Sequence, residues 1–448
     1  MSLSKQKAAS ELIAEGDGAA TASSRRTVQR PGASSKKSSG TRNAGGDNTG
    51  AIVISLLLAA AAIAATYWAT TGSTQTRPAP PNTALRDIAR QLLHPSKGIL
   101  AADESPATFG KLLGKGVPNT LAVRRQWRHA VLSAPGLEDH ISGLILHEET
   151  FIHGGPDVQS AASRGIAVGI KLDEGTVPLQ PKKAGERSTR GLEGLAARCT
   201  RFRERGGAVF AKWRAVFRVG RHTPSCGAIR RNAADLAAFA AAAQTCGLLP
   251  ILEPEVLAEG DHDLQRAAAA AARVLRGVFR ALRRQPDVDP GGLLLKVAFV
   301  TPGQQAAVQA EPDQVANATL RVLLRTVPRV VPGIVFLSGG QGEAATTANL
   351  LAISRLAQER MLAGKQPLPW ALSFSFGRAL QSSALIAWQR GDVAEAQALL
   401  KTRAEVNAMA QQGQQKVVVG TLTEAFSPAP PPGGGLTGRV GDSGSRGG

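Results

Sequence analysis

Short apolar runs recur along the middle of the chain and alternate with longer stretches of helical pattern. The apolar runs cover 98–103, 141–149, 166–173, 208–217, 248–256, 292–300, 333–340 and 370–377, and the helical stretches include 235–247 and 262–284. Strands that alternate with helices are typical of βαβ units around a parallel sheet. Eight such units within 83–426 predict an α/β fold of the (β/α)8 TIM-barrel type. An open doubly wound sheet is the alternative.

The two ends of the chain differ from this middle part in composition. Residues 1–50 are rich in Ser, Gly, Ala and Arg and hold almost no large apolar side chains, which predicts a disordered basic lead. Residues 71–82 have the composition of a linker, and the Pro/Gly-rich residues 427–448 predict a disordered tail. The part expected to fold is therefore 83–426.

Residues 51–70 form an uncharged apolar stretch, AIVISLLLAAAAIAATYWAT. About 20 such residues are the length that one helix needs to span a bilayer, and Tyr67 and Trp68 fit an interfacial belt near its end. We therefore expect a transmembrane helix and a membrane-associated protein. The alternatives are a buried helix or a targeting segment that is removed, because the lead also resembles an organelle transit peptide. A processed chain would be plastid or cytoplasmic.

The formal net charge of +19 suggests an anionic partner. The arginines are scattered, however, and no stretch interleaves aromatic with basic residues, so the pattern argues against a nucleic-acid partner. The three cysteines, Cys199, Cys226 and Cys246, are too widely spaced for a CxxC metal site or a disulfide framework. The best evidence on function therefore comes from charges placed inside the strands.

Five of the apolar runs carry charged residues where a buried strand should be apolar. These residues are Asp103, Lys171, Asp173, Lys212, Arg214, Glu253, Glu255 and Lys296. Those that occur in pairs are two positions apart, so both members of a pair point to the same face of a strand. For any single residue, a salt-bridged or surface position is the simpler interpretation. Five strands with the same feature favour side chains that converge at the C-terminal mouth of a barrel, where barrel active sites lie.

Lys296 lies inside the run GGLLLKVAFVTPG at 291–303 and suggests covalent chemistry. A buried amine beside another cation, here Lys212, loses its proton more easily, and a neutral lysine attacks a carbonyl to form a Schiff base. The last two runs end in SGGQGE (338–343) and FGRAL (376–380), where glycine turns lead into helices whose free amides can bind phosphate. These residues predict a Schiff-base lyase that acts on a phosphorylated carbonyl compound.

Six motifs in the same order resemble those of class I fructose-bisphosphate aldolase. They are KGILAADES (97–105), GIKLDEGTVPL (169–179), FAKWR (210–214), EPEVLAEGDHDL (253–264), FLSGGQ (336–341) and FSFGRALQSSALIAW (374–388). The resemblance implies a lyase that needs neither a metal nor a cofactor beyond its own lysine imine. The implied reaction is the reversible cleavage of fructose 1,6-bisphosphate to dihydroxyacetone phosphate and glyceraldehyde 3-phosphate, a step of glycolysis, gluconeogenesis and the Calvin cycle. It also implies a homo-oligomer, commonly a tetramer.

The resemblance assigns roles to residues that match the family motifs. Lys296 is the implied Schiff-base lysine, Glu253 the acid/base of imine formation, and Asp103 the acceptor of the C4-hydroxyl proton. Lys212 and Glu255 are the implied neighbours that tune charge and proton transfer. The implied contacts with substrate and phosphate are Lys171, Arg214, Ser338, Gly339, Gly377 and Arg378, and no metal ligand is implied.

The chain differs from the family pattern at several positions. Val297 and Ala298 replace the usual Pro-Asn after the lysine, Leu112 replaces a phosphate-binding Arg, and Phe376 replaces a Tyr. The family's mobile C-terminal Tyr has no counterpart, because the only tyrosine is Tyr67. These differences leave two alternatives: a catalytically impaired, membrane-tethered aldolase-like scaffold, or an aldolase that prefers another ketose phosphate.

Overall fold

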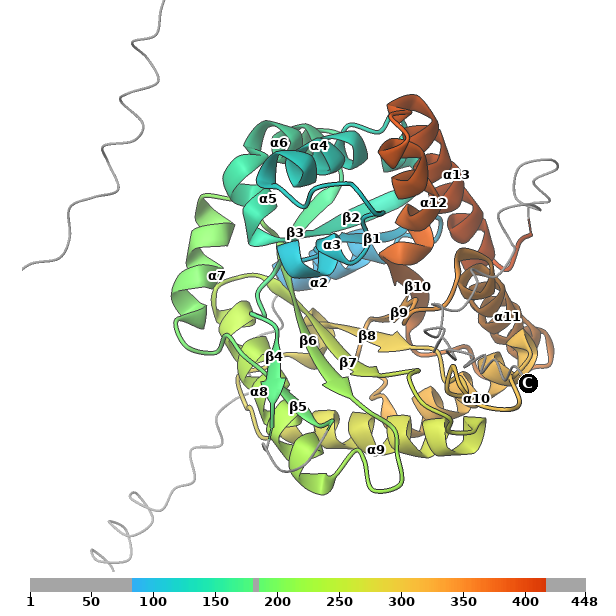
Figure 1. Cartoon of the computed structure of the whole chain (residues 1–448). Helices are drawn as coiled ribbons and strands as arrows, with labels where there is room; N and C mark the ends of the chain where they lie inside the picture. The colour runs from blue at the N-terminus through green and yellow to red at the C-terminus, as the bar shows by residue number, and fades with distance from the viewer. Residues whose placement is uncertain (1–82, 180–184, 416–448) are drawn as a thin grey trace, which may run out of the picture. The chain divides into compact units, whose positions relative to one another are not determined.

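Residues 83–179 and 185–415 are described in a computed structural model, and they fold around a closed barrel of parallel strands. The strands are β1 (Gly98–Ala102), β2 (Ile141–Leu146), β3 (Ala167–Lys171), β6 (Phe210–Phe217), β7 (Leu249–Val256), β8 (Leu294–Ala298), β9 (Gly333–Leu337) and β10 (Ala371–Phe376). Their order around the barrel is β1, β10, β9, β8, β7, β6, β3, β2. Because β1 pairs with β10, the predicted TIM barrel is confirmed and the open sheet is excluded (Figure 1).

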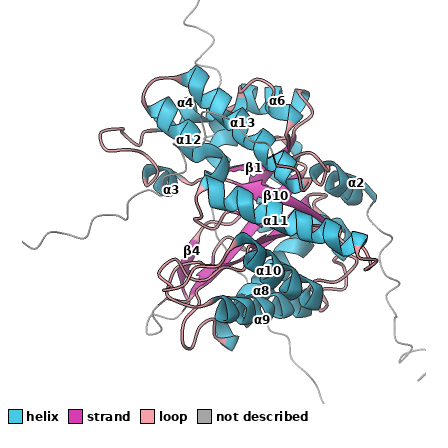
Figure 2. Cartoon of the chain, turned by 90° about the vertical axis from the view of Figure 1, so that its right-hand side faces the viewer, coloured by secondary structure: helices cyan, strands magenta, loops and turns pink. Residues whose placement is uncertain are grey.

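Helices connect the strands and surround them, as the view in Figure 2 also shows. They are α2 (Thr83–Leu92), α3 (Pro106–Gly110), α4 (Leu121–Leu132), α5 (Glu148–His153), α6 (Gly155–Ser163), α7 (Leu195–Glu204), α8 (Cys226–Thr245), α9 (Leu264–Leu282), α10 (Pro312–Thr326), α11 (Glu343–Leu362), α12 (Arg378–Gln389) and α13 (Val393–Gln411). Two 3-10 turns, η1 (Leu137–Asp139) and η2 (Pro290–Gly292), and a small antiparallel pair, β4 (Thr176–Pro178) with β5 (Arg187–Thr189), complete the described elements.

Capping side chains begin several of these helices. Thr120, Ser225 and Asp263 precede α4, α8 and α9, and each accepts a hydrogen bond from the backbone N–H three residues later. Such a cap satisfies one of the free amides of the first turn and is worth about 1 kcal/mol. The caps therefore help to set where each connecting helix leaves the preceding loop.

Side chains alternate between the two faces of each strand, and this alternation produces two apolar cores. The larger core lies between the strands and the helices. The smaller one fills the lower interior of the barrel with residues such as Ile99, Ile145, Phe210 and Val335. Helix α2 contributes Leu85, Ala89 and Leu92 to this smaller core, so it closes the N-terminal end of the barrel.

Glycines make room for Phe210 inside the barrel. A Cβ atom added to Gly169 would lie 2.2 Å from the Phe210 ring, and one added to Gly143 would lie 3.4 Å from it. The Phe210 side chain is fully buried. The aromatic ring thus fills the space that two neighbouring strands leave empty, and it forms a packed floor beneath the mouth of the barrel.

None of the helices within the described ranges is long and apolar enough to cross a membrane. The predicted transmembrane segment 51–70 lies outside the described residues, as do the lead 1–50, the linker 71–82 and the tail 427–448. Attachment to a membrane and disorder of the two ends therefore stay predictions from the sequence.

Replacing Gly169 by Ala should destabilise the barrel, because the new methyl group would overlap the Phe210 ring. Overpacking of this kind costs about 1–3 kcal/mol. The free energy of unfolding in urea measures the effect. Gly155→Ala is the matched control, since a Cβ atom there meets no atom within 4 Å. Equal stability of the two variants would contradict this account of the floor.

Candidate active site

All the site residues expected from the sequence line one cavity of about 980 Å³. They are Asp103, Lys171, Lys212, Arg214, Glu253, Glu255, Lys296, Ser338, Gly339, Gly377 and Arg378. Most of them lie in the second half of their strands or in the loops that follow, whereas Lys212 and Lys296 are the third residues of β6 and β8. The cavity therefore opens at the C-terminal end of the barrel. This is the end at which barrel enzymes place their active sites.

Four charged side chains form a continuous network in the cavity. The Lys212 Nζ atom lies 2.7 Å from Asp103 Oδ2 and 3.0 Å from Glu253 Oε2. The other oxygen of Glu253, Oε1, lies 3.3 Å from Lys296 Nζ. Lys212 and Lys296 are each 3% exposed and Glu253 is 4% exposed. Two carboxylates therefore alternate with two amines inside the barrel, from β6, β7 and β8 and from the residue that follows β1.

Burial and charge act in opposite directions on the pKa values of this network. Burial alone would raise the pKa of Asp103, but Lys212 and Lys296 outweigh it and hold that pKa well below the usual range. The pKa of Glu253 is lowered for the same reason, against the effect of burial. Burial would lower the pKa of Lys212, but Asp103 and Glu253 raise it well above the ordinary value for lysine. Both carboxylates are thus ionised and Lys212 is protonated near neutral pH.

Two further cations of the expected site, Lys171 and Arg214, are paired with carboxylates. The Lys171 amine lies 2.7 Å from Asp173 Oδ1, and the Arg214 guanidinium donates to Glu255. In both cases the position of the cation is fixed before any ligand arrives. Fixed cations lose little conformational entropy when they bind an anion, which favours tight binding of phosphate.

Two loops after the last two strands bring backbone amides to the same cavity. Gly339 and Gly340 follow β9 with φ angles of +56° and +89°, a conformation that other residues rarely adopt. Gly377 precedes α12, whose first residue is Arg378, so the free amides of a helix N-terminus face this end of the barrel. The Arg378 side chain lies beside Gly340, since a Cβ atom there would be 3.3 Å from Nη2. The geometry fits a phosphate cradle.

Sequence reasoning missed several residues that also line the cavity. They include Glu104, Lys111, His147, Arg198 and Ser375. The sequence did contain a signal for Ser375. This residue lies two positions before Gly377 on β10, so the alternation of side chains places it on the same inward face. Its hydroxyl is buried and makes no hydrogen bond with any residue in 83–179 or 185–415. A ligand that enters the cavity could therefore use it.

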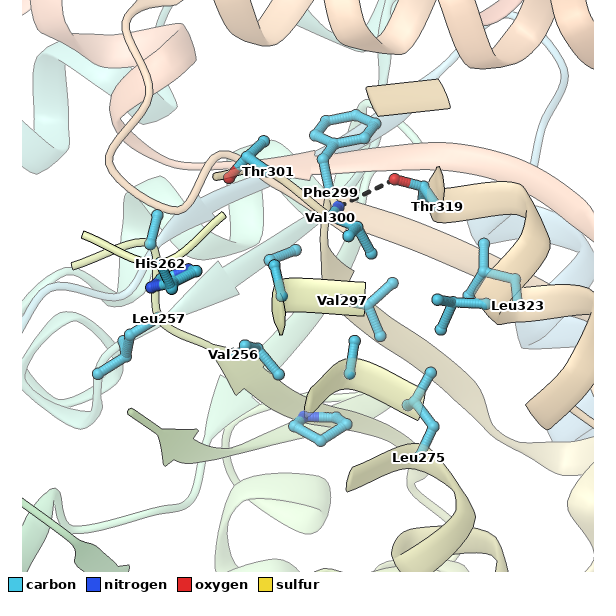
Figure 3. A pocket seen from close by; sticks show the side chains of 16 residues that line it. Val256, Leu257, His262, Leu275, Val297, Phe299, Val300, Thr301, Thr319 and Leu323 are labelled. Carbon is cyan, nitrogen blue, oxygen red and sulfur yellow. Dashed lines mark hydrogen bonds between the residues drawn. The ribbon is translucent and has the colours of Figure 1, made fainter. Parts of the chain in front are cut away.

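A second, much smaller cavity of about 30 Å³ lies on the other side of β8. Figure 3 shows that its lining is mostly apolar, with Val256, Leu275, Val297 and Leu323 around it. Val297 follows Lys296 directly, so its side chain points away from the larger cavity and toward the helices. The change from the usual Pro at this position therefore lies in the packing behind the strand, not among the charged groups.

Replacing Lys212 by Met should leave Asp103 and Glu253 buried with one cation fewer. Removing one partner of a buried ion pair costs about 3–5 kcal/mol of stability. In the native protein, the lowered pKa of Asp103 means that its ionised form stabilises the fold. This stabilisation is fully present above pH 3.8, the ordinary pKa of an Asp side chain, and it is lost as the pH falls below that value. In the variant, the carboxyl groups would take up protons at higher pH, so its deficit should shrink between pH 7 and pH 4.5.

The free energy of unfolding, measured at both pH values, tests this expectation. Lys401→Met is the matched control, because the Lys401 amine lies 3.8 Å from Asp139 in an exposed pair. Loss of such a pair is worth at most about 1 kcal/mol. A deficit of the Lys212 variant that is small, or equal at the two pH values, would contradict the account of the network.

Comparison with known proteins agrees with this geometry. The family model described as fructose-bisphosphate aldolase class-I matches residues 84–425. Fructose-bisphosphate aldolase C of Homo sapiens is 45% identical over 338 residues, which cover 74% of this chain and 90% of that protein. Fructose-bisphosphate aldolase of Drosophila melanogaster is also 45% identical over 338 residues, with the same coverage.

A solved structure shows the same similarity in three dimensions. It is the fructose-bisphosphate aldolase of Plasmodium falciparum, determined in complex with TRAP and a small-molecule inhibitor. The TM-score is 0.70 at 40% sequence identity, and the match covers 75% of this chain and 97% of that chain. With a family model that spans most of its length and relatives at this level of identity, the chain belongs to the class I fructose-bisphosphate aldolase family.

Proposed function

We propose that the protein reversibly cleaves fructose 1,6-bisphosphate to dihydroxyacetone phosphate and glyceraldehyde 3-phosphate through a Schiff base on Lys296. One observation carries this proposal: the Lys296 amine lies buried at the mouth of the barrel, 3.3 Å from the carboxylate of Glu253. A buried amine next to a proton-transfer group is the arrangement that imine formation needs. No metal is required, because the protonated imine itself accepts the electron pair.

The first half of the reaction uses Lys296 and Glu253. The neutral Lys296 amine attacks the C2 carbonyl of the ketose, and one proton of the resulting ammonium moves from nitrogen to the carbonyl oxygen. Loss of that oxygen as water requires a second proton, which Glu253 can relay because it contacts both lysines. The product is a protonated imine between Nζ and C2.

The second half of the reaction breaks the C3–C4 bond. Asp103 accepts the proton of the C4 hydroxyl, the C4–O bond becomes a carbonyl, and the electron pair of the C3–C4 bond moves into the imine. The aldehyde leaves and an enamine remains on Lys296. Protonation at C3 and hydrolysis of the imine then release dihydroxyacetone phosphate. Asp103 is ionised at neutral pH because of Lys212, so it is available as the proton acceptor in each cycle.

The competing hypothesis is a scaffold that has lost catalysis. A chain without catalysis would have no chemical reason to keep charged side chains inside the barrel. Buried charges carry a large desolvation penalty, so their loss in such a chain would be expected. The complete network of Asp103, Lys212, Glu253 and Lys296 therefore supports an active enzyme. Assembly into a homotetramer stays a prediction from the family resemblance.

The direct test is to trap the imine. The full chain is incubated with dihydroxyacetone phosphate, reduced with borohydride, and digested for mass spectrometry. We expect an adduct on Lys296, and we expect Lys296→Met to lose both the adduct and at least about 10³-fold in cleavage rate, as removal of a nucleophile usually does. Lys111→Met should keep the adduct at Lys296, since Lys111 lines the cavity outside the network. An adduct only on another lysine would overturn the assignment.

Leu112 bears on which ketose phosphate the enzyme prefers. It lines the cavity beside Lys111, at a position that supplies no charge to a second phosphate. Leu112→Arg should therefore raise kcat/KM for fructose 1,6-bisphosphate relative to fructose 1-phosphate by about ten-fold, the usual value of a charge-assisted hydrogen bond. Leu112→Gln is the uncharged control and should leave the ratio nearly unchanged. An unaltered ratio in both variants would show that this position does not contact the second phosphate.

A further inference from the structure

His147 occupies an inward-facing position between two residues of the proposed site. Ala102 is in register with Leu146, and Leu146 is in register with Ile170. The next residue along each strand is therefore also in register, which places side by side Asp103, His147 and Lys171. Figure 1 shows β1, β2 and β3 adjacent in the barrel. All three side chains line the catalytic cavity.

The tautomer of the His147 ring is set by the start of the next helix. Its Nδ1 atom accepts a hydrogen bond from the Glu149 N–H at 3.2 Å, so His147 caps α5. A neutral imidazole that accepts at Nδ1 carries its proton on Nε2. Burial and the nearby Lys171 hold the pKa of His147 below its usual value, against the opposing effects of Asp103 and Glu149. The ring is therefore a neutral donor at neutral pH.

The Nε2 atom is left open to the cavity. It makes no hydrogen bond with any residue in the described ranges, and it is not one of the polar atoms buried there without a partner. A fixed, unsatisfied N–H group that points into a ligand cavity is ready to bind an oxygen atom of the ligand.

The order of the strands indicates which part of the substrate passes over His147. Lys296 lies on β8, the phosphate cradle follows β9 and β10, and Asp103 follows β1. A ketose with its carbonyl carbon at Lys296 and its C4 hydroxyl at Asp103 must extend its remaining atoms across β2 and β3. These atoms belong to the half of the substrate that leaves as the aldehyde.

We propose that His147 donates a hydrogen bond from Nε2 to a hydroxyl group of this aldehyde half and is thus a further substrate-binding residue. This inference rests on the proposed function of the site. A neutral donor suits a hydroxyl group, whereas a phosphate is better bound by a cation such as the adjacent Lys171.

Two substitutions distinguish the role of His147 as a hydrogen-bond donor to the substrate from its role as the cap of α5. His147→Asn keeps a side-chain oxygen that can accept from the Glu149 N–H, as Asn does at many N-caps, but it has no group at the Nε2 position. His147→Gln places an amide N–H near the Nε2 position and gives up the cap. A role in substrate binding predicts that Gln rescues activity and Asn does not, whereas a purely structural role predicts the reverse.

The experiment measures kcat and KM of the full chain for fructose 1,6-bisphosphate and for fructose 1-phosphate, together with thermal unfolding and borohydride trapping of dihydroxyacetone phosphate. We expect His147→Asn to lose roughly ten-fold in kcat/KM on both substrates, which is the usual effect of one hydrogen bond. His147→Gln should stay within about three-fold of the wild type. Trapping on Lys296 should be unchanged in both variants, because dihydroxyacetone phosphate lacks the aldehyde half.

Three results for the two variants would overturn the inference alone. Wild-type activity of His147→Asn would show that His147 makes no contact that matters for substrate binding. A loss confined to fructose 1,6-bisphosphate would assign the contact to the distal phosphate instead of a hydroxyl group. A loss of activity in His147→Gln alone, together with a lower unfolding temperature, would show that His147 acts only as the cap of α5. A wild-type chain that traps no imine and cleaves neither ketose would overturn the proposed function itself, and the inference with it.

Discussion

The contact of Lys212 with two carboxylates is the interaction on which the rest of the site depends. Its amine lies within 3.0 Å of Asp103 and of Glu253, and all of these groups are largely removed from water. Each charge alone would carry a desolvation penalty of several kcal/mol. Together they hold Asp103 and Glu253 ionised at the two places where the proposed reaction moves protons. The second oxygen of Glu253 then reaches Lys296, so the nucleophile is tied to the same network.

This network can exist only in a closed barrel with a fixed register. Its members come from β1, β6, β7 and β8, and a shift of one residue in any of these strands would turn a charged side chain toward the helices. The packed floor below the network limits such shifts, because Phe210 fills the space opposite Gly169. The apolar lower half of the barrel therefore positions the polar upper half.

The sequence alone was sufficient to predict the barrel and many of the residues that line its cavity, but not the contacts between them or the other lining residues such as Ser375. The eight apolar runs each contain one strand, and charges two positions apart, such as Glu253 and Glu255, identified the inward face. Pairing between strands is a long-range property, so nothing local showed that Lys212 would bind Asp103 and Glu253 rather than only repel Lys296. His147 could not be predicted for a related reason: its importance comes from its neighbours across the sheet, and it carries no charge that would mark it in an apolar run.

The outward position of Val297 has a consequence for how such enzymes can vary. Leu295 and Val297, on either side of Lys296, pack in the core between the strands and the helices, and Val297 also lines the small cavity beyond β8. A change there alters packing volume and strand rigidity without adding or removing a charge near the substrate. The inward face of β8 must therefore keep the side chains that face the cavity, whereas its outward face needs only to pack against the helices. Substitutions on the outward face can change the stability of the barrel without changing the groups at the cavity.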